Sequence, residues 1–170
     1  FCIDQTTMPF PNEKEYKKLL ADYGTAEERG QGEGDERAMH VRFNDFLLKM
    51  RDNLVPIRTD GSGVAHYDTE KDAVYMPRQK DFEHYNDYVQ ETLRQIVSAT
   101  GHQQRLAREG MVMKNGTAPS EDAIKRERLV AELASGVKML ELGLPARLSE
   151  EGLHLTDYWV RELKENPCLI

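Results

Sequence analysis

Five stretches of this chain repeat hydrophobic residues at the spacing of an α-helix. Their apolar positions lie three or four residues apart, so each stretch presents one apolar stripe. The stretches are residues 12–23, 38–52, 82–100, 120–142 and 149–164. The clearest is 82–100, whose stripe contains Tyr85, Val89, Leu93, Ile96, Val97 and Thr100. The pattern therefore predicts about five helices.

The stretch 120–142 also carries signals for its two ends. Ser120 is a typical N-cap, two acidic residues follow it, and Gly143 is a typical stop. The apolar spacing within this helix predicts an inward face made of Leu129, Leu133, Val137 and Leu140.

Between residues 55 and 76 the period changes from helical to alternating. VAHYD (64–68) and AVYMP (73–77) predict two β-strands joined by a turn at residues 69–72. Pro56 lies in a further short extended piece, which we expect at a sheet edge because proline has no N–H to donate. The fold class is therefore α+β, with a small antiparallel β-meander packed on a bundle of about five helices.

Residues 1–11 and 24–37 follow neither period. The first segment contains two prolines and predicts an extended, linker-like piece, and the second is polar and glycine-rich and predicts a loop. The chain starts with Phe1 rather than methionine. We therefore expect residues 1–170 to be a single domain taken from a longer protein.

The charge, apolar content and cysteines of the chain indicate which partners and which compartment to expect. The net charge is −7, so the chain lacks the basic excess of proteins that bind DNA or anionic lipid, and a protein or peptide partner is favoured. No apolar run approaches the ~20 residues of a membrane span. Cys2 and Cys168 allow one bridge between the ends, but two free thiols in a reducing compartment fit them better, which predicts the cytoplasm.

Several segments match a known pattern around the helix that ends in Ala99-Thr100-Gly101-His102. AHYDTEKDAVYMPRQK precedes this helix and RERLVAELASGVKMLELGL follows it. Together they resemble the zincin-like metallopeptidase domain of the ArdC-type antirestriction protein family, whose members accompany conjugative plasmids and transposons. The pattern of that family is a YD…MP hairpin, a helix of the form HE-x-x-H-ATGH, and a later ELVAEL helix that carries a glutamate ligand.

The opening FCIDQT is also similar to the linker FNIDQT of this family. In the family that linker follows an N-terminal single-stranded-DNA-binding domain. The resemblance thus implies a zincin-like fold for this chain. It also implies that single-stranded DNA would be bound only through a domain missing from residues 1–170.

The ATGH tetrapeptide sets the register for carrying the motif over. Arg94 then holds the first metal-histidine position, Gln95 the position of the catalytic glutamate, and Ser98 the second histidine position. Only Glu132 is retained as the third ligand. Arginine has no lone pair for a metal, glutamine is no general base, and serine is a poor neutral ligand. We therefore expect no catalytic residue, no metal ligands and no cofactor, zinc included.

The residues of this degenerate site allow different roles. Arg94 and Ser98 are either solvated helix surface or part of a reused cleft. Glu132 lies near the apolar face of its helix and needs a partner if it is buried, so we hypothesise that it pairs with Arg94. His102 fits a helix-end residue better than a metal ligand.

Three functions stay open. The first is a catalytically inactive zincin-like metallopeptidase homologue, a pseudoenzyme that acts as a binding or scaffolding module of a mobile-element protein. The second is a repurposed enzyme with a non-zinc hydrolytic site, for which Ser98 and His102 are the one nucleophile–base pair in the motif. The third is a purely structural oligomerisation domain. The sequence identifies neither the partner nor the oligomeric state.

Overall fold

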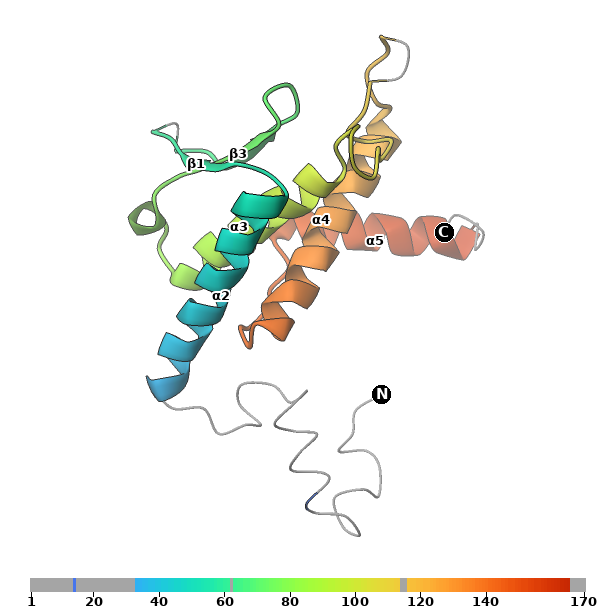
Figure 1. The fold of residues 1–170 in the computed structure, drawn as a ribbon. Helices are drawn as coiled ribbons and strands as arrows, with labels where there is room; N and C mark the ends of the chain where they lie inside the picture. The colour runs from blue at the N-terminus through green and yellow to red at the C-terminus, as the bar shows by residue number, and fades with distance from the viewer. Residues whose placement is uncertain (1–13, 15–32, 62, 114–115, 166–170) are drawn as a thin grey trace.

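The computed structural model describes residue 14 and residues 33–61, 63–113 and 116–165. The linker expected at residues 1–11 lies outside this part, and so does the helix expected at residues 12–23, apart from Lys14. The described chain is α+β, as the sequence predicts (Figure 1). Its elements are α2 (Glu33–Asn53), β1 (Ile57–Thr59), β2 (His66–Asp68), β3 (Ala73–Met76), the 3-10 turn η2 (Gln79–Asp81), α3 (Tyr85–Thr100), α4 (Glu121–Glu141) and α5 (Glu150–Glu165).

Two helix starts differ from the predicted ones. Residues 33–37, expected to belong to a loop, are the first turn of α2. α3 begins at Tyr85, because η2 and an extended Phe82 precede it. The ends of α4 agree with the prediction: Ser120 Oγ accepts a hydrogen bond from the Ala123 N–H at 3.2 Å, and Gly143 has a φ of 80°. None of the described helices is both long and apolar enough to cross a membrane.

The sheet has the order β1-β3-β2, which corrects the expected antiparallel meander. β2 and β3 form the predicted hairpin, with Tyr67 opposite Val74, but β1 pairs in parallel with β3. Among these three strands β3 is the most deeply buried, and a strand covered on both faces belongs at the centre of a sheet. Pro56 directly precedes the edge strand β1, as predicted.

Two groups of buried apolar residues hold these elements together. One lies between α2, α3 and α4 and contains Phe43, Val89, Leu93, Met139, Leu142 and Leu144. The other lies between the sheet and α3 and contains Val55, Val74, Met76 and Ala99. Because α3 contributes to both groups and also packs along α4, its side chains are held in fixed positions.

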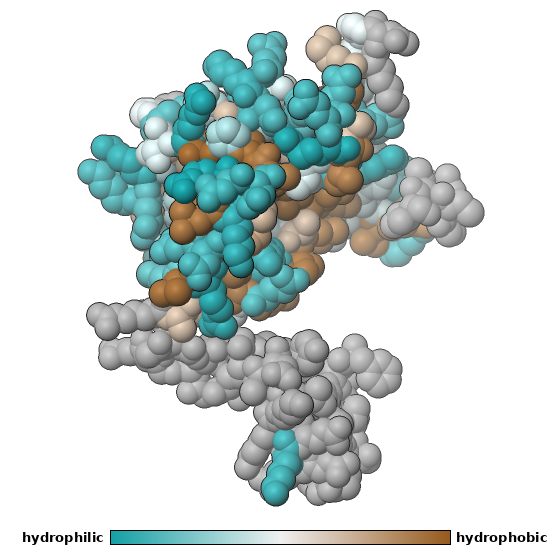
Figure 2. All heavy atoms as spheres, viewed as in Figure 1, coloured by the Kyte–Doolittle hydropathy of each residue, from teal (hydrophilic) through white to brown (hydrophobic). Residues whose placement is uncertain are grey.

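The inward face of α4 is not the predicted one. Leu133, Val137 and Leu140 are 47%, 59% and 58% exposed, and Leu129 is half-buried. Figure 2 shows hydrophobic atoms along the surface of this helix. Its buried residues are Ala123, Glu127, Ala131, Glu132, Ser135 and Met139. This face is mostly small or polar, so α4 approaches α3 closely and polar pairs, rather than leucines, fill the contact.

Candidate functional site

Arg94 and Glu132 meet where α3 packs against α4. The Arg94 Nε and Nη2 atoms donate to Glu132 Oε2 and Oε1 at 2.5 and 2.9 Å, which makes a two-pronged pair. The Glu132 side chain is 5% exposed and the Arg94 side chain 20%. The hypothesised pair is confirmed, and Arg94 is not solvated helix surface.

Glu132 also connects α4 to the start of α5. Its Oε1 accepts a hydrogen bond from the Ser149 N–H at 2.6 Å. A Cβ atom on Gly152 would lie 2.5 Å from Glu132 Cγ, so only glycine allows this approach. Burial alone would raise the pKa of Glu132, but the hydrogen bonds from Arg94 and Ser149 hold that pKa below its usual value. The carboxylate therefore stays ionised and joins three helices.

Glu91 is a member of the site that the sequence analysis missed. Its Oε2 accepts from Arg94 Nη1 at 2.8 Å, and its Oε1 accepts from Gln95 Nε2 at 2.7 Å. Arg94 is thus held between two carboxylates, and the Gln95 amide is held by one of them. The signal was available: Glu91 lies three and four residues before these partners on one helix, where side chains are neighbours.

Ser98 lies in the last turn of α3, and His102 lies in the turn that follows it. Within the described residues no hydrogen bond joins them, and His102 Nδ1 instead accepts from the Gln104 N–H at 3.3 Å. The His102 N–H bonds to the Ala99 carbonyl at 3.1 Å in the turn that ends α3. This matches the predicted helix-end role of His102.

A second arginine, Arg105, joins the turn at the end of α3 to the β2–β3 hairpin through hydrogen bonds. Its Nε donates to the Ala99 carbonyl at 2.7 Å, and its Nη1 donates to Asp72 Oδ2 at 3.0 Å. Asp72 also accepts from the Tyr67 hydroxyl at 2.6 Å. Hydrogen bonds from Arg105 lower the pKa of Asp72 to about 2, although burial opposes the shift. Asp72 is therefore committed to Arg105 and Tyr67.

A third arginine, Arg108, repeats the two-pronged geometry on the previous turns of α4. Its Nε and Nη2 donate to Glu127 Oε2 and Oε1 at 2.7 and 2.6 Å, and the Glu127 side chain is 7% exposed. Arg108 also donates to Thr100 Oγ1 at 2.8 Å and to the Val97 carbonyl at 2.7 Å. Nothing in the apolar pattern marked Arg105 or Arg108, because each bonds to a segment distant in sequence.

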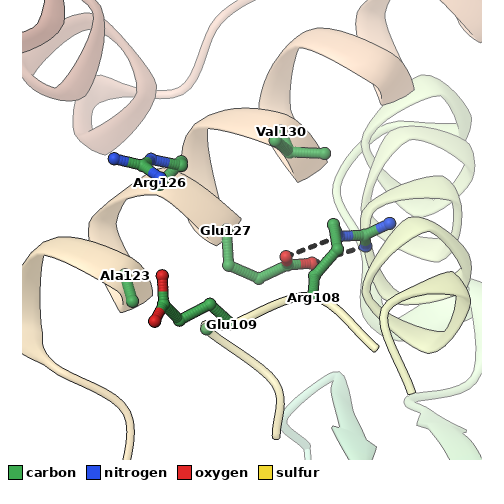
Figure 3. A pocket seen from close by; sticks show the side chains of 7 residues that line it. Arg108, Glu109, Ala123, Arg126, Glu127 and Val130 are labelled. Atoms are coloured by element: carbon green, nitrogen blue, oxygen red, sulfur yellow. Dashed lines mark hydrogen bonds and ion pairs between the residues drawn. The ribbon is translucent and has the colours of Figure 1, made fainter. Parts of the chain in front are cut away.

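A cavity of about 220 Å³ lies beside the Arg108–Glu127 pair. Figure 3 shows the two side chains facing each other, with the backbone around Glu109 passing close to α4. Gly110 permits this approach, because a Cβ atom there would lie 2.4 Å from the Ala123 carbonyl oxygen. Arg108 and Glu127 satisfy one another, so the cavity offers no uncommitted charged group from this pair.

The donor set at the Arg94–Glu132 position does not suit a metal ion. A guanidinium has no lone pair, and the Glu132 oxygens already accept three hydrogen bonds. Within the described residues no three His, Cys, Asp or Glu side chains form a group that could hold a metal. No metal is therefore assigned to this position.

Comparison with known proteins gives two matches. The model of the zincin-like metallopeptidase family (MPTase-PolyVal) matches residues 48–170. The crystal structure of the antirestriction ArdC protein from plasmid R388, in its Mn(II)-bound form, superimposes with a TM-score of 0.60 at 22% identity. That match covers 74% of this chain and 44% of the ArdC chain, so the chain spans less than half of ArdC. Among curated proteins no significant match was found.

These matches correct the expectation that no cofactor is involved. The family is one of metallopeptidases, and the similar structure carries Mn(II), so the comparisons point to metal binding. The expectation came from the four motif positions alone, and those positions do not describe the metal chemistry of the whole family. The correction leaves the Arg94–Glu132 geometry unchanged.

Proposed function

Because the chain belongs to the zincin-like metallopeptidase family, we propose that it is a non-hydrolytic zincin-like module that binds a protein or peptide partner. The observation that carries the proposal is the Arg94–Glu132 pair, with Gln95 beside it. The relation to an antirestriction protein of a plasmid supports a place in a mobile-element protein. We place it in the cytoplasm, which suits its two isolated cysteines.

Peptide hydrolysis by a zincin needs a base that takes a proton from the attacking water. The register of the motif puts Gln95 at that place, and an amide has no basic lone pair. The nearby carboxylates offer no replacement, because Glu91 and Glu132 both accept hydrogen bonds from Arg94. The lowered pKa of Glu132 further weakens it as a base.

The edge strand β1 offers a surface where a peptide partner could bind. The Pro56 carbonyl accepts from the Val74 N–H at 2.9 Å, and the Asp60 N–H donates to the Met76 carbonyl at 3.1 Å. Backbone groups alternate in direction along a strand, so those of Ile57 and Thr59 face the free edge. An extended peptide can pair with such an edge as an added strand. The acidic balance of the chain favours this class of partner over nucleic acid.

The proposal is tested with a pool of unstructured peptides, supplied with Mn(II) or Zn(II) and recovered from the immobilised protein. We expect a subset of peptides to be retained and to be intact by mass spectrometry. Thr59→Pro removes a donor from the free edge and should lower retention several-fold, whereas Thr59→Val keeps the donor and should not.

Two results would overturn it. Metal-dependent cleavage that Gln95→Ala or Glu132→Ala abolishes would restore a peptidase function. If the parent and the two Thr59 variants all retain no peptide, the binding role would be ruled out.

A further inference from the structure

Arg58 lies on the edge strand β1 without an acidic partner. Its side chain is exposed, and among the described residues no carboxylate, carbonyl or aromatic ring holds its guanidinium. The neighbouring Ile57 belongs to the opposite face of the strand and packs against the apolar group between the sheet and α3. Arg58 therefore lies on the outer face of the sheet, where its charge can be used by a molecule that binds at this edge.

A row of three residues crosses that outer face. Tyr75 on β3 is the register partner of Arg58, and His66 on β2 is the register partner of Tyr75. The His66 and Tyr75 rings stack with their centres 5.1 Å apart, and Lys71 Nζ lies 5.6 Å from the centre of the Tyr75 ring. On one side Arg58 thus has a tyrosine held by two neighbours, and on its other side it has the free edge of the sheet.

The backbone of β1 determines how an added peptide would meet Arg58. Ile57 and Thr59 direct their N–H and C=O groups to the free edge, whereas those of Arg58 face β3. An antiparallel peptide, the more stable arrangement, therefore makes its hydrogen-bonded pairs at Ile57 and Thr59 and a non-hydrogen-bonded pair at Arg58. In the latter kind of pair the Cα atoms are only about 4.5 Å apart, so the two side chains meet most closely at Arg58.

The chemistry of these positions selects the side chains of the peptide. The residue opposite Arg58 lies on the outer face, beside a guanidinium fork that a carboxylate matches with two parallel hydrogen bonds. A lysine at the same position would be repelled. The residue opposite Ile57 lies on the inner face, where an aliphatic side chain extends the buried apolar group. An acidic residue between aliphatic ones therefore fits this edge.

The negative charge of the whole chain acts over a longer range than this contact. At physiological ionic strength exposed charges more than about 8 Å apart are largely screened from one another. Directly opposed side chains lie well within that distance, so Arg58 dominates the selection although the net charge is −7.

We propose that the peptide partner carries aspartate or glutamate opposite Arg58, between aliphatic residues, and that Arg58 is the specificity-determining residue of this edge. The inference rests on the proposed function, because it requires a peptide to pair with β1. It goes further in naming the side chain that is selected and the residue that selects it.

Three short labelled peptides test the selection. They alternate threonine and valine around a central residue that is glutamate, glutamine or lysine, so that the central side chain and the valines lie on opposite faces. Fluorescence anisotropy measures their binding to the full chain. Arg58→Glu is the test variant, and Lys164→Glu on α5 is the matched control, because it changes the net charge equally. Both positions are exposed, so neither change should disturb folding.

We expect the parent to bind the glutamate peptide about three-fold more tightly than the glutamine peptide and about ten-fold more tightly than the lysine peptide. Arg58→Glu should reverse this order, so that the lysine peptide binds best. Lys164→Glu should keep the order of the parent.

Three other results would overturn the inference. Equal binding of the three peptides, still weakened by Thr59→Pro, would overturn it and leave the proposed function standing. Tighter binding of all three peptides to Arg58→Ala would mean that Arg58 only protects the edge from pairing. If no peptide binds to the parent or to the variants, the proposed function falls, and this inference falls with it.

Discussion

The two halves of α4 pack against the rest of the fold by different chemistry. In the first half the buried carboxylates of Glu127 and Glu132 each receive a two-pronged hydrogen bond from an arginine. In the second half Met139 lies in an apolar group with Phe43 and Leu93. One helix therefore makes ion pairs and an apolar contact within a few turns.

Ion pairs and apolar contacts contribute differently to the stability of the fold. Apolar burial contributes about 25 cal/mol per Å² and has no preferred direction. A buried ion pair contributes little net stability, since desolvation offsets most of the attraction, but it is costly to break from one side. The ionic half therefore joins α4 to α3 and to the start of α5 by directional contacts, whereas the apolar half stabilises the packing by burial.

Phe43→Ala should have the largest effect on stability. Phe43 lies on α2, where it is fully buried in the apolar group that contains Met139 of α4, and its truncation should lower the free energy of unfolding by about 3–5 kcal/mol. Urea unfolding at low and high salt measures this loss, which should not depend on salt. Leu48→Ala on the exposed side of the same helix is the control and should change stability by less than about 0.5 kcal/mol.

Arg94→Ala should cost about 3 kcal/mol, because it leaves Glu132 buried without its charge partner. Arg94→Met combined with Glu132→Gln removes both charges and keeps an acceptor for Ser149, so most of the loss should be recovered. Arg161→Ala breaks an exposed pair with Asp157 and serves as the control with no measurable effect. An Arg94→Ala variant as stable as the parent would contradict the structural role of the pair.

Arg94→His, Gln95→Glu and Ser98→His together should turn the ionic contact into a metal site with Glu132. We expect the affinity for Zn(II) or Mn(II) to rise about 100-fold over the parent, since two imidazoles and a carboxylate replace a guanidinium. Isothermal titration calorimetry measures the gain, and adding Glu132→Ala should abolish it. A folded triple variant with no gain would show that the motif register is wrong.

Asp72→Asn should make a smaller, pH-dependent difference. The folded-state pKa of Asp72, about 2, lies below its ordinary value of 3.8, so ionisation stabilises the fold above about pH 4. The advantage of the parent over the variant, about 1–2 kcal/mol after allowance for partial exposure, should vanish as pH falls from 4 to 2. Asparagine tolerates the φ of 47° at this position, which makes it the appropriate replacement. A pH-independent difference would contradict the assignment.

Local features of this protein were decided by the sequence itself. The Ser120 cap, the Gly143 stop and the turn between β2 and β3 depend on residues close together in the chain, and all were predicted. The motif register also identified Arg94 and Glu132 as partners, because it compares positions and needs no packing information.

The tertiary structure alone decided which faces and segments meet. Spacing showed that α4 has an apolar stripe but not that Glu127 and Glu132 would take the inward side, since this depends on arginines from other segments. The parallel pairing of β1 with β3 and the bonds of Arg105 to Asp72 likewise join residues far apart in sequence. Their energies depend on three-dimensional proximity, which periodicity along the chain does not encode.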